Sequence, residues 1–383
     1  MTTKLYDLCA YDTRFTATVL SCDKRENGYA IILDRTLFFP EEGGQEADGG
    51  TLSGCRVTYV SIDKEGIITH FLDEPLTVGK EVTGEIDFAF RFRNMQNHTA
   101  EHILSGIAHR LYGCENVGFH LGREEMTLDF DKPLSEEQLL TLETAANEAV
   151  FRNLSVKATY PQKEDLARLS YRAKLDLTEN VRLVEIEDTD LCACCAPHVK
   201  KTGEVGLIKI RSAMHHKGGM RLFAAAGIDA LRDYRQKEKS VVEISHLLSV
   251  PESEVAPAVA ALLAANGKLK GEKNDILRLF AASMADSLEV TDKNACLFFE
   301  TREVRVLRDA ALAALSKVGG AIVVCGGEDT AYSYVIASKS IDLRQKAKEY
   351  NEALSGRGGG NAEMIQGTFA ATKAEIKAYF AKQ

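Results

Sequence analysis

At residues 93–113 the chain reads RNMQNHTAEHILSGIAHRLYG. Apolar residues and histidines in this stretch recur every three to four positions, which predicts an α-helix, and Gly113 supplies its stop. His98 and His102 are four residues apart and therefore lie on one face of the expected helix. Two imidazoles at this spacing can share a metal ion.

A second metal-binding pattern lies in a cysteine-rich turn, where residues 192–198 read CACCAPH. Cys194 and His198 repeat the four-residue spacing. One histidine pair alone is more often part of a core, but two such pairs supply four borderline-soft ligands, which suit Zn²⁺ and suit Mg²⁺ or Ca²⁺ poorly. Cys192 and Cys195 fall outside this spacing, and a different choice among the three cysteines stays open.

The ligand set is compatible with a structural or a catalytic zinc. Four protein ligands would close a tetrahedral shell, as in structural sites, but those usually use tight cysteine-rich knuckles, whereas here a helix joins a distant turn. This arrangement favours catalysis or substrate placement. A zinc protease of the H-E-x-x-H type is excluded, because Thr99 follows the first histidine and Glu101 comes two positions later.

Outside these motifs the sequence predicts an α+β multidomain protein. Short β-branched and aromatic runs in residues 1–90 favour a small N-terminal β-barrel. Residues 91–229 combine the histidine helix with strands and with a second helix over 135–152, whose capping box is Ser135 with Gln138, so a central α+β zinc-containing domain is expected. The expected barrel strands are residues 30–33, 37–39, 57–60 and 66–71.

The remaining chain is expected to be a helical spacer, residues 230–290, and a C-terminal α/β domain, residues 291–383. The spacer carries an apolar stripe that is typical of a core or a dimer seam, so a homodimer through the helical and C-terminal region is one expected assembly. The Gly-rich residues 356–360 predict a turn. Other expected elements are strands at 296–299, 321–325 and 333–337 and helices at 302–318, at 343–354 and from Thr372.

Composition limits the classes of function. The 383 residues are 45% hydrophobic and 27% charged, as in soluble globular proteins. The longest apolar runs, such as residues 321–325, are too short to span a bilayer, and the N-terminus lacks a secretory pattern. We therefore expect a cytoplasmic protein with no membrane partner, whose nine cysteines are thiols or metal ligands.

Charge is unevenly distributed along the chain. The formal net charge of −9 argues against a nucleic-acid partner, because phosphate binding needs clustered Lys and Arg. Residues 301–383, however, hold 12 Lys and Arg against 9 Asp and Glu, whereas residues 1–230 hold 26 against 36. If RNA is bound electrostatically, the C-terminal third is the better candidate to hold it.

The motifs resemble those of a known family. Residues 98–102 and 194–199 resemble the paired H-x-x-x-H and C-x-x-x-H motifs of the editing domain of alanyl-tRNA synthetase and its stand-alone relatives, the AlaX proteins. Residues 33–50 are similar to that family's Gly-rich motif, and residues 358–367 to the Gly-rich segment of the DHH-associated domain that ends alanyl-tRNA synthetases. The whole chain resembles the long form of AlaX, which lacks the aminoacylation half.

The resemblance implies a hydrolase that cleaves the aminoacyl ester of mischarged tRNA(Ala), either Ser-tRNA(Ala) or Gly-tRNA(Ala). Nucleotide binding, ATP included, is a further expectation for a relative of that synthetase. Gly43 and Gly44 have an alternative explanation as a tight turn between strands, and His120 as a solvent-facing loop residue. The implied residues are the Zn²⁺ ligands His98, His102, Cys194 and His198, the catalytic residues Gln45, Glu101 and His120, and the substrate-binding residues Gly43, Gly44 and Thr99.

Binding energetics explain why such an enzyme is needed. One missing methyl group changes binding by only about 1–3 kcal/mol, so a pocket for alanine cannot strongly exclude glycine, and it rejects serine only weakly. Two alternatives remain. One is editing of Ser-tRNA(Thr), because the threonyl-tRNA synthetase editing domain has a similar metal pattern. The other is a non-catalytic tRNA-binding protein with a structural zinc.

Overall fold

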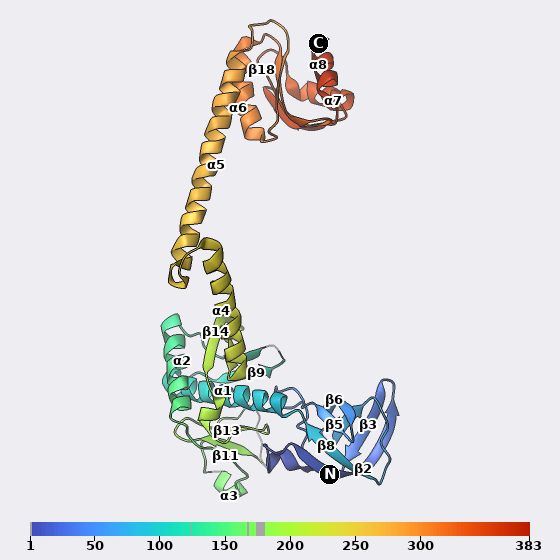
Figure 1. Ribbon diagram of the computed structural model, residues 1–383, viewed down its shortest axis with the longest axis vertical. Helices are drawn as coiled ribbons and strands as arrows, with labels where there is room; N and C mark the ends of the chain where they lie inside the picture. Colours follow the sequence, from blue (N-terminus) through green and yellow to red (C-terminus); the bar gives the residue numbers. More distant parts are fainter. Residues whose placement is uncertain (1, 124, 167, 174–180) are drawn as a thin grey trace. The chain divides into compact units, whose positions relative to one another are not determined.

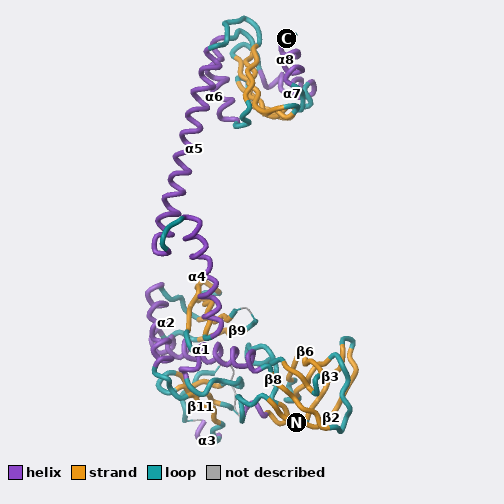
Figure 2. The backbone as a smooth tube through the Cα atoms, in the orientation of Figure 1, coloured by secondary structure: helices purple, strands orange, loops and turns teal. Residues whose placement is uncertain are grey.

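The helix expected around His98 forms and is buried on all sides. α1 (Phe88–Tyr112) begins after Asp87, whose carboxylate accepts a hydrogen bond from the Phe90 N–H, and it ends at Gly113, which has a φ of 61°. Residues 93–108 are all buried, because α1 contacts α2 and strands of two sheets. Figure 2 shows α1 running between these strands. The predicted helix and its glycine stop are confirmed.

The computed structural model describes residues 2–123, 125–166, 168–173 and 181–383. These residues form two compact units, Met1–Ser240 and Val241–Gln383. The protein is thus a mixed α+β multidomain chain, as expected (Figure 1). The four predicted domains divide it more finely, and their boundaries stay predictions.

The first unit begins with a closed barrel, with strand order β2-β3-β7-β6-β5-β8, so the predicted N-terminal barrel is confirmed. The prediction of a strand at residues 37–39 was wrong. These residues lie in a buried loop after β4, because Arg91 of α1 donates a hydrogen bond to the Leu37 carbonyl and Asp48 accepts one from the Phe39 N–H. The strands of this part are β1 (Thr3–Lys4), β2 (Arg14–Arg25), β3 (Gly28–Leu33), β4 (Arg35–Thr36), β5 (Gly50–Leu52), β6 (Cys55–Ile62), β7 (Ile68–Leu72) and β8 (Glu81–Ile86).

Two antiparallel sheets and three long helices, α1, α2 and α4, follow the barrel. The sheets have the orders β14-β15-β10-β9 and β11-β12-β13. The predicted capping box is confirmed, since the Gln138 N–H donates to Ser135 Oγ and the Ser135 N–H to Gln138 Oε1. The elements are β9 (Asn116–Leu121), β10 (Met126–Phe130), α2 (Glu136–Phe151), β11 (Val156–Thr159), α3 (Lys163–Leu166), β12 (Leu183–Ile186), β13 (Asp190–Ala193), β14 (Ile208–His216), β15 (Gly219–Ala226) and α4 (Ile228–Leu248), which crosses into the second unit.

The second unit is built on a five-stranded mixed sheet of order β16-β17-β18-β20-β19. The prediction of a Gly-rich turn at residues 356–360 was wrong, because residues 357–360 form β19 and pair with β20. The two strands lie so close that a Cβ added at Gly358 would come 2.3 Å from the Gln366 carbonyl oxygen. The elements are α5 (Val255–Asp286), β16 (Ala295–Phe299), α6 (Val304–Ala314), β17 (Ala321–Glu328), β18 (Ala331–Ser338), α7 (Leu343–Ala353), β19 (Arg357–Gly360), β20 (Met364–Phe369) and α8 (Lys373–Ala381).

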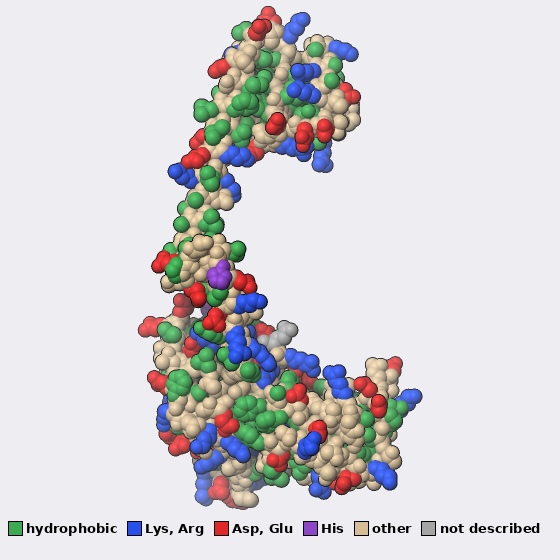
Figure 3. Space-filling model, in the orientation of Figure 1, with side chains coloured by type: hydrophobic (Ala, Val, Ile, Leu, Met, Phe, Trp, Pro, Cys, Tyr) green, Lys and Arg blue, Asp and Glu red, His purple; other side chains and the backbone are tan. Residues whose placement is uncertain are grey.

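α5 exposes most of its length. Only Ala281 and Ala285 of its 32 residues are buried, against α6 and the sheet. Leu262, Leu269 and Ile276 recur at seven-residue intervals and are 57–65% exposed. Apolar side chains are visible along this helix in Figure 3. The predicted homodimer through this region stays a prediction.

None of the described helices is by itself long and apolar enough to cross a bilayer. Two consecutive segments joined at a bend, Ile228–Leu248 and Glu252–Asp286, meet the length and composition requirement only when they are taken together.

Candidate metal centre

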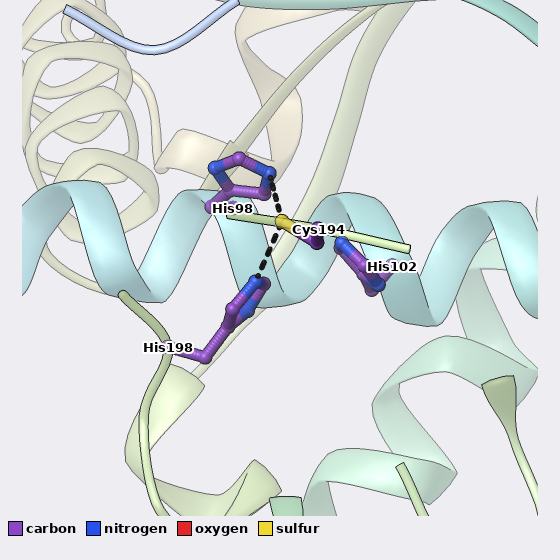
Figure 4. Close-up of side chains that lie close together, drawn as sticks. All are labelled: His98, His102, Cys194 and His198. Carbon is purple, nitrogen blue, oxygen red and sulfur yellow. Dashed lines mark hydrogen bonds between the residues drawn. The ribbon is translucent and has the colours of Figure 1, made fainter. Parts of the chain in front are cut away.

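The structure brings the four predicted ligand residues together. One donor atom each from His98, His102, Cys194 and His198 lies within 4.8 Å of all the others. Figure 4 shows the Cys194 sulfur between the His98 and His198 rings, with Sγ–Nε2 distances of 3.5 and 3.3 Å. Helix α1 supplies two of these residues, and the turn after β13 supplies the other two. This group could hold a metal ion.

Each of the three histidines uses its second ring nitrogen for a bond to a different partner. Nδ1 of His98 lies 2.8 Å from Gln45 Oε1, and Nδ1 of His102 lies 2.9 Å from an Asp190 carboxylate oxygen. Nδ1 of His198 lies 3.0 Å from Thr99 Oγ1. Ligand histidines are generally oriented in this way, with Nδ1–H donating to an outer oxygen and Nε2 left for the ion.

Asp190 is held in place for His102 by two further contacts. Arg172 donates to both carboxylate oxygens of Asp190, at 2.7 and 2.8 Å. Gly106 of α1 makes the close approach possible, because a Cβ added there would lie 2.7 Å from the Asp190 Cβ. These hydrogen bonds outweigh the effect of burial and keep the pKa of Asp190 below its usual value, so the carboxylate is ionised.

The turn that carries Cys194 is fixed by Arg182. The Arg182 guanidinium donates to the carbonyl oxygens of Cys194 and Ala196, and the Cys194 N–H donates to the Arg182 carbonyl. Arg182 precedes β12, which pairs with β13. The same strand pair therefore positions both the Asp190 carboxylate and the thiol ligand.

Gln45 reaches the site from the barrel side. The buried Gln45 follows a turn in which Gly43 and Gly44 have φ values of 63° and 83°. A Cβ added at Gly44 would come 2.4 Å from the Phe119 carbonyl oxygen, so this turn docks closely on β9. A tight turn therefore explains why glycine is present at both positions. The predicted role of Gly43 and Gly44 in substrate binding stays a prediction.

A buried ion pair joins the same loop to α1. Arg91 and Asp48 are fully or almost fully buried, and the Arg91 Nε lies 2.9 Å from Asp48 Oδ1. Arg91 also donates to the backbone carbonyls of Ala10 and Leu37. These contacts fix the loop that places Gln45 beside His98.

The protonation states of the Cys194 thiol and the His198 ring suit metal binding. Burial raises the pKa of the Cys194 thiol, but the neighbouring His98 and His198 lower it well below its ordinary value, which favours the thiolate. Burial lowers the pKa of His198 to about 3, so this ring is neutral. Burial also lowers the pKa of His102, but the Glu101 carboxylate and the bond to Asp190 outweigh it and raise that pKa well above 6.5. The surroundings of His102 thus favour a positive charge on the ring, and a metal ion would have to displace its proton.

The other two cysteines of the turn differ from Cys194. Burial raises the pKa of Cys192 to about 11 and also raises the pKa of Cys195, so both stay protonated. Cys192 does form a second potential ligand group with His102 and Asp190, but the Asp190 carboxylate is already bound by Arg172. Cys194 is therefore the best suited of the three cysteines to bind a metal.

The remaining predicted site residues lie in different places. Glu101 is 3% exposed, and one of its carboxylate oxygens is 3.6 Å from His102 Nε2, beside the ligand group. His120 is exposed on β9 and lines a cavity of about 600 Å³ with Arg56, Arg123 and Arg232. Among the described residues that line this cavity, none is a ligand residue. The structure therefore places His120 apart from the metal group.

Sequence reasoning missed Asp190, Arg172 and the structural role of Arg182. A signal for Asp190 was present, because Asp190 and Cys192 alternate and so point to one face of a strand, just before Cys194. Nothing comparable marked Arg172, since its contact depends on tertiary packing.

Comparison with known proteins identifies a shared domain. Residues 181–223, which include Cys194 and His198, match the family described as the threonyl and alanyl tRNA synthetase second additional domain. A solved C-Ala domain of Aquifex aeolicus alanyl-tRNA synthetase matches 24% of this chain and 94% of its own at 23% identity, with a TM-score of 0.21.

Longer matches are found among curated proteins. The alanyl-tRNA editing protein AlaX-L of Pyrococcus horikoshii is 24% identical, with 98% of this chain and 96% of that protein covered. The alanyl-tRNA editing protein Aarsd1 of Mus musculus is 28% identical, with coverage of 73% and 72%. The alanine–tRNA ligase of Natronomonas pharaonis is 31% identical over 90% of this chain, which spans only 39% of that ligase.

Proposed function

Since the chain is a relative of the alanyl-tRNA editing proteins, as its paired motifs predicted, we propose that it hydrolyses the aminoacyl ester of mischarged tRNA(Ala). The substrates would be Ser-tRNA(Ala) and also Gly-tRNA(Ala). The observation that carries the proposal is the convergence of His98, His102, Cys194 and His198 in a chain that matches an editing protein over almost its whole length.

We propose Zn²⁺ as the ion at this centre. The donor set is one thiolate and three imidazoles, which suits a borderline-soft divalent ion. The three Nδ1 contacts support the assignment, because they leave each Nε2 to face the thiolate or the space beside it. Zinc bound there would supply a Lewis acid for the ester carbonyl.

The surrounding residues would orient the ester and the ligands. Gln45 and Thr99 would hold His98 and His198 through their side-chain oxygens, so both would act as positioning residues. Gly43 and Gly44 would shape the wall beside them. An aminoacyl ester is already activated, so a fixed orientation can supply much of the rate enhancement.

The RNA part of the substrate would bind outside the ligand group. His120 lies with four arginines and four acidic residues around the cavity of the first unit, and we propose that it contacts the RNA end instead of the reacting atoms. Arginine is suited to phosphate oxygens, because its planar guanidinium can bind them in pairs. The protein would act in the cytoplasm, where tRNA is charged.

Two other functions have specific support. The matched family covers threonyl as well as alanyl tRNA synthetases, which supports editing of Ser-tRNA(Thr). Four protein ligands can fill a tetrahedral shell, which supports a structural zinc in a non-catalytic tRNA-binding protein.

A deacylation assay separates these functions. We expect the zinc-loaded protein to cleave Ser-tRNA(Ala), to spare most Ala-tRNA(Ala) and to leave Ser-tRNA(Thr) intact. The Cys194→Ala variant should be inactive and lose its zinc, whereas Cys9→Ala, at an exposed cysteine, should match the wild type. Cleavage of Ser-tRNA(Thr) alone would reverse the substrate assignment. One bound zinc and tRNA binding without any deacylation would establish the structural alternative.

A further inference from the structure

A cavity of about 380 Å³ lies at one end of the sheet in the second unit. Its lining includes Arg302, just before α6, and Arg357, at the start of β19. The hydroxyl residues Ser333 of β18 and Thr368 of β20 also line it. No acidic residue is among the described residues of the lining. In a chain with a formal net charge of −9, a cavity whose charged lining residues are arginines indicates an anionic ligand.

The strand register places three of these side chains in one row. Ser333 is paired with Thr368 between β18 and β20, and Arg357 is paired with the same Thr368 between β19 and β20. Directly paired residues of neighbouring strands project to the same face of a sheet. Neighbouring strands are about 4.8 Å apart, so two hydroxyl groups and a guanidinium group follow one another across this face.

Two glycines of β17 bring the second arginine to the same row. Gly326 is paired with Ser333, and a Cβ added at Gly326 would overlap the Thr301 carbonyl oxygen. A Cβ added at Gly327, whose φ is 141°, would come 3.2 Å from Arg302 Nε. The absence of both Cβ atoms lets the segment before α6 lie directly on β17. Arg302 therefore stands at the β17 end of the row, and the other arginine stands at the β19 end.

The two arginines are available to a ligand. Neither Arg302 nor Arg357 forms an ion pair with a described residue. Other cations of the second unit do, such as Arg344, which lies 3.0 Å from Asp342. A guanidinium group binds two phosphate oxygens through parallel N–H bonds, and a serine or threonine hydroxyl donates to a further oxygen. A phosphate monoester presents three terminal oxygens and a carboxylate two, so a phosphate group makes fuller use of donors at both ends of the row.

We propose that this cavity is a phosphate-binding site of the second unit. The phosphate group lies over Ser333 and Thr368, with Arg302 and Arg357 on its two sides. It belongs either to a phosphate monoester, such as a free nucleotide, or to the backbone of a bound RNA. The site is independent of the proposed deacylation, because all of its lining residues belong to the second unit.

Titration of the full chain with two phosphate sources tests this site. Adenosine 5′-monophosphate is the monoester probe, and adenosine is the matched probe without phosphate. If the ligand is a monoester, calorimetric titration should show at least about 10-fold tighter binding of the monophosphate, as expected for hydrogen bonds to a charged group. Uncharged tRNA(Ala) is the phosphodiester probe, and its affinity is measured over a range of salt concentrations.

Two exposed arginines can be changed without disturbing the core. Arg302→Gln and Arg357→Gln should each weaken binding of the phosphate-bearing probe by about 10-fold. For tRNA, each variant should also reduce the slope of log affinity against log salt by about one, because one phosphate contact is lost. Arg344→Gln is the matched control, since this exposed arginine is paired with Asp342, and it should bind both probes as the wild type does.

The pattern of losses identifies the source of the phosphate. A loss confined to the monophosphate identifies a free monoester, a loss confined to tRNA identifies an RNA backbone, and a loss for both shows that the site accepts either. Unchanged binding of both probes in Arg302→Gln and Arg357→Gln would overturn the site. An equal loss in Arg344→Gln would also overturn it, because the effect would then come from the overall charge of the second unit.

Discussion

Helices α1 and α5 both depart from the usual distribution, in which apolar side chains are buried and polar ones are exposed. α1 buries many polar side chains, whereas α5 exposes many apolar ones. α1 has 25 residues, of which 17 are buried, and the buried set includes Arg91, Asn97, Glu101 and His102. α5 has 32 residues, of which two alanines are buried, and it exposes several leucines and Ile276 along its length. Buried polar side chains and exposed apolar ones are the informative exceptions in folded proteins.

The difference shows where each helix has its partners. The polar residues of α1 meet partners within the first unit, which include Asp48, Asp190 and Gln45. The apolar residues of α5 have few such neighbours in the described chain. A row of exposed apolar residues is typical of an interaction surface, and the predicted homodimer would cover it.

The largest expected effect comes from the buried ion pair of α1. Arg91→Met should reduce the free energy of unfolding by about 3–5 kcal/mol, because it leaves the Asp48 carboxylate buried without its cation. Guanidinium unfolding of the protein measures this change. The control is Arg14→Met, which removes an exposed pair with Glu85 and should cost less than about 1 kcal/mol. An equal decrease in the free energy of unfolding in Arg91→Met and Arg14→Met would show that the burial of Arg91 does not increase the contribution of its ion pair to stability.

A smaller effect is expected where α1 meets β13. Asp190→Asn should weaken zinc binding by about 10- to 100-fold, because an outer hydrogen bond orients the His102 ligand. Competition with a chelator measures this affinity. Asp188→Asn, at an exposed position two residues away, should leave it unchanged. An unchanged affinity in Asp190→Asn would mean that His102 needs no such support.

The N-terminal ends of α1 and α5 give a third comparison. Asp87→Ala should destabilise the protein by about 1 kcal/mol, because the carboxylate caps α1 through the Phe90 N–H. Glu254→Ala should have almost no effect, since Glu254 makes no side-chain cap at the start of α5. Thermal unfolding under identical conditions tests both. Similar shifts in the two variants would contradict the assigned cap.

The smallest effect on folding is expected on α5. Leu269→Glu should change the free energy of unfolding by less than about 0.5 kcal/mol, because the side chain is 64% exposed. The same substitution should convert a dimer into a monomer, as measured by light scattering after gel filtration. Lys270→Glu on the same helix is the control and should remain dimeric. A monomeric wild type would remove the dimer prediction.

Much of the fold follows from local patterns in the sequence. The 3.6-residue period and Gly113 predicted α1, and Ser135 with Gln138 predicted the start of α2, because caps and periodicity act within a few residues. The Gly-rich residues 356–360 were assigned to a turn by the same local rules. Gly358 and Gly360 are needed for close approach to β20, which only the sheet reveals.

The four residues of the candidate metal group could be predicted for the same reason, whereas the contacts that His98 and His102 make with Gln45 and Asp190 could not. The spacing of His98 and His102 follows from one helix, and that of Cys194 and His198 from one turn. The contact of His98 with Gln45 joins residues 53 positions apart, because the barrel docks on β9 through Gly44. Such pairs depend on how the barrel and sheets pack, which no local pattern records.

X-ray absorption at the zinc edge of the purified protein tests the central claim most directly. We predict one zinc per chain with one sulfur ligand at about 2.3 Å and three nitrogen ligands at about 2.0–2.1 Å, and loss of the sulfur signal in Cys194→Ser. Two results would contradict the convergence of α1 and the turn after β13 on one ion. One is a purified protein without zinc, and the other is a zinc ion with no sulfur ligand or with two.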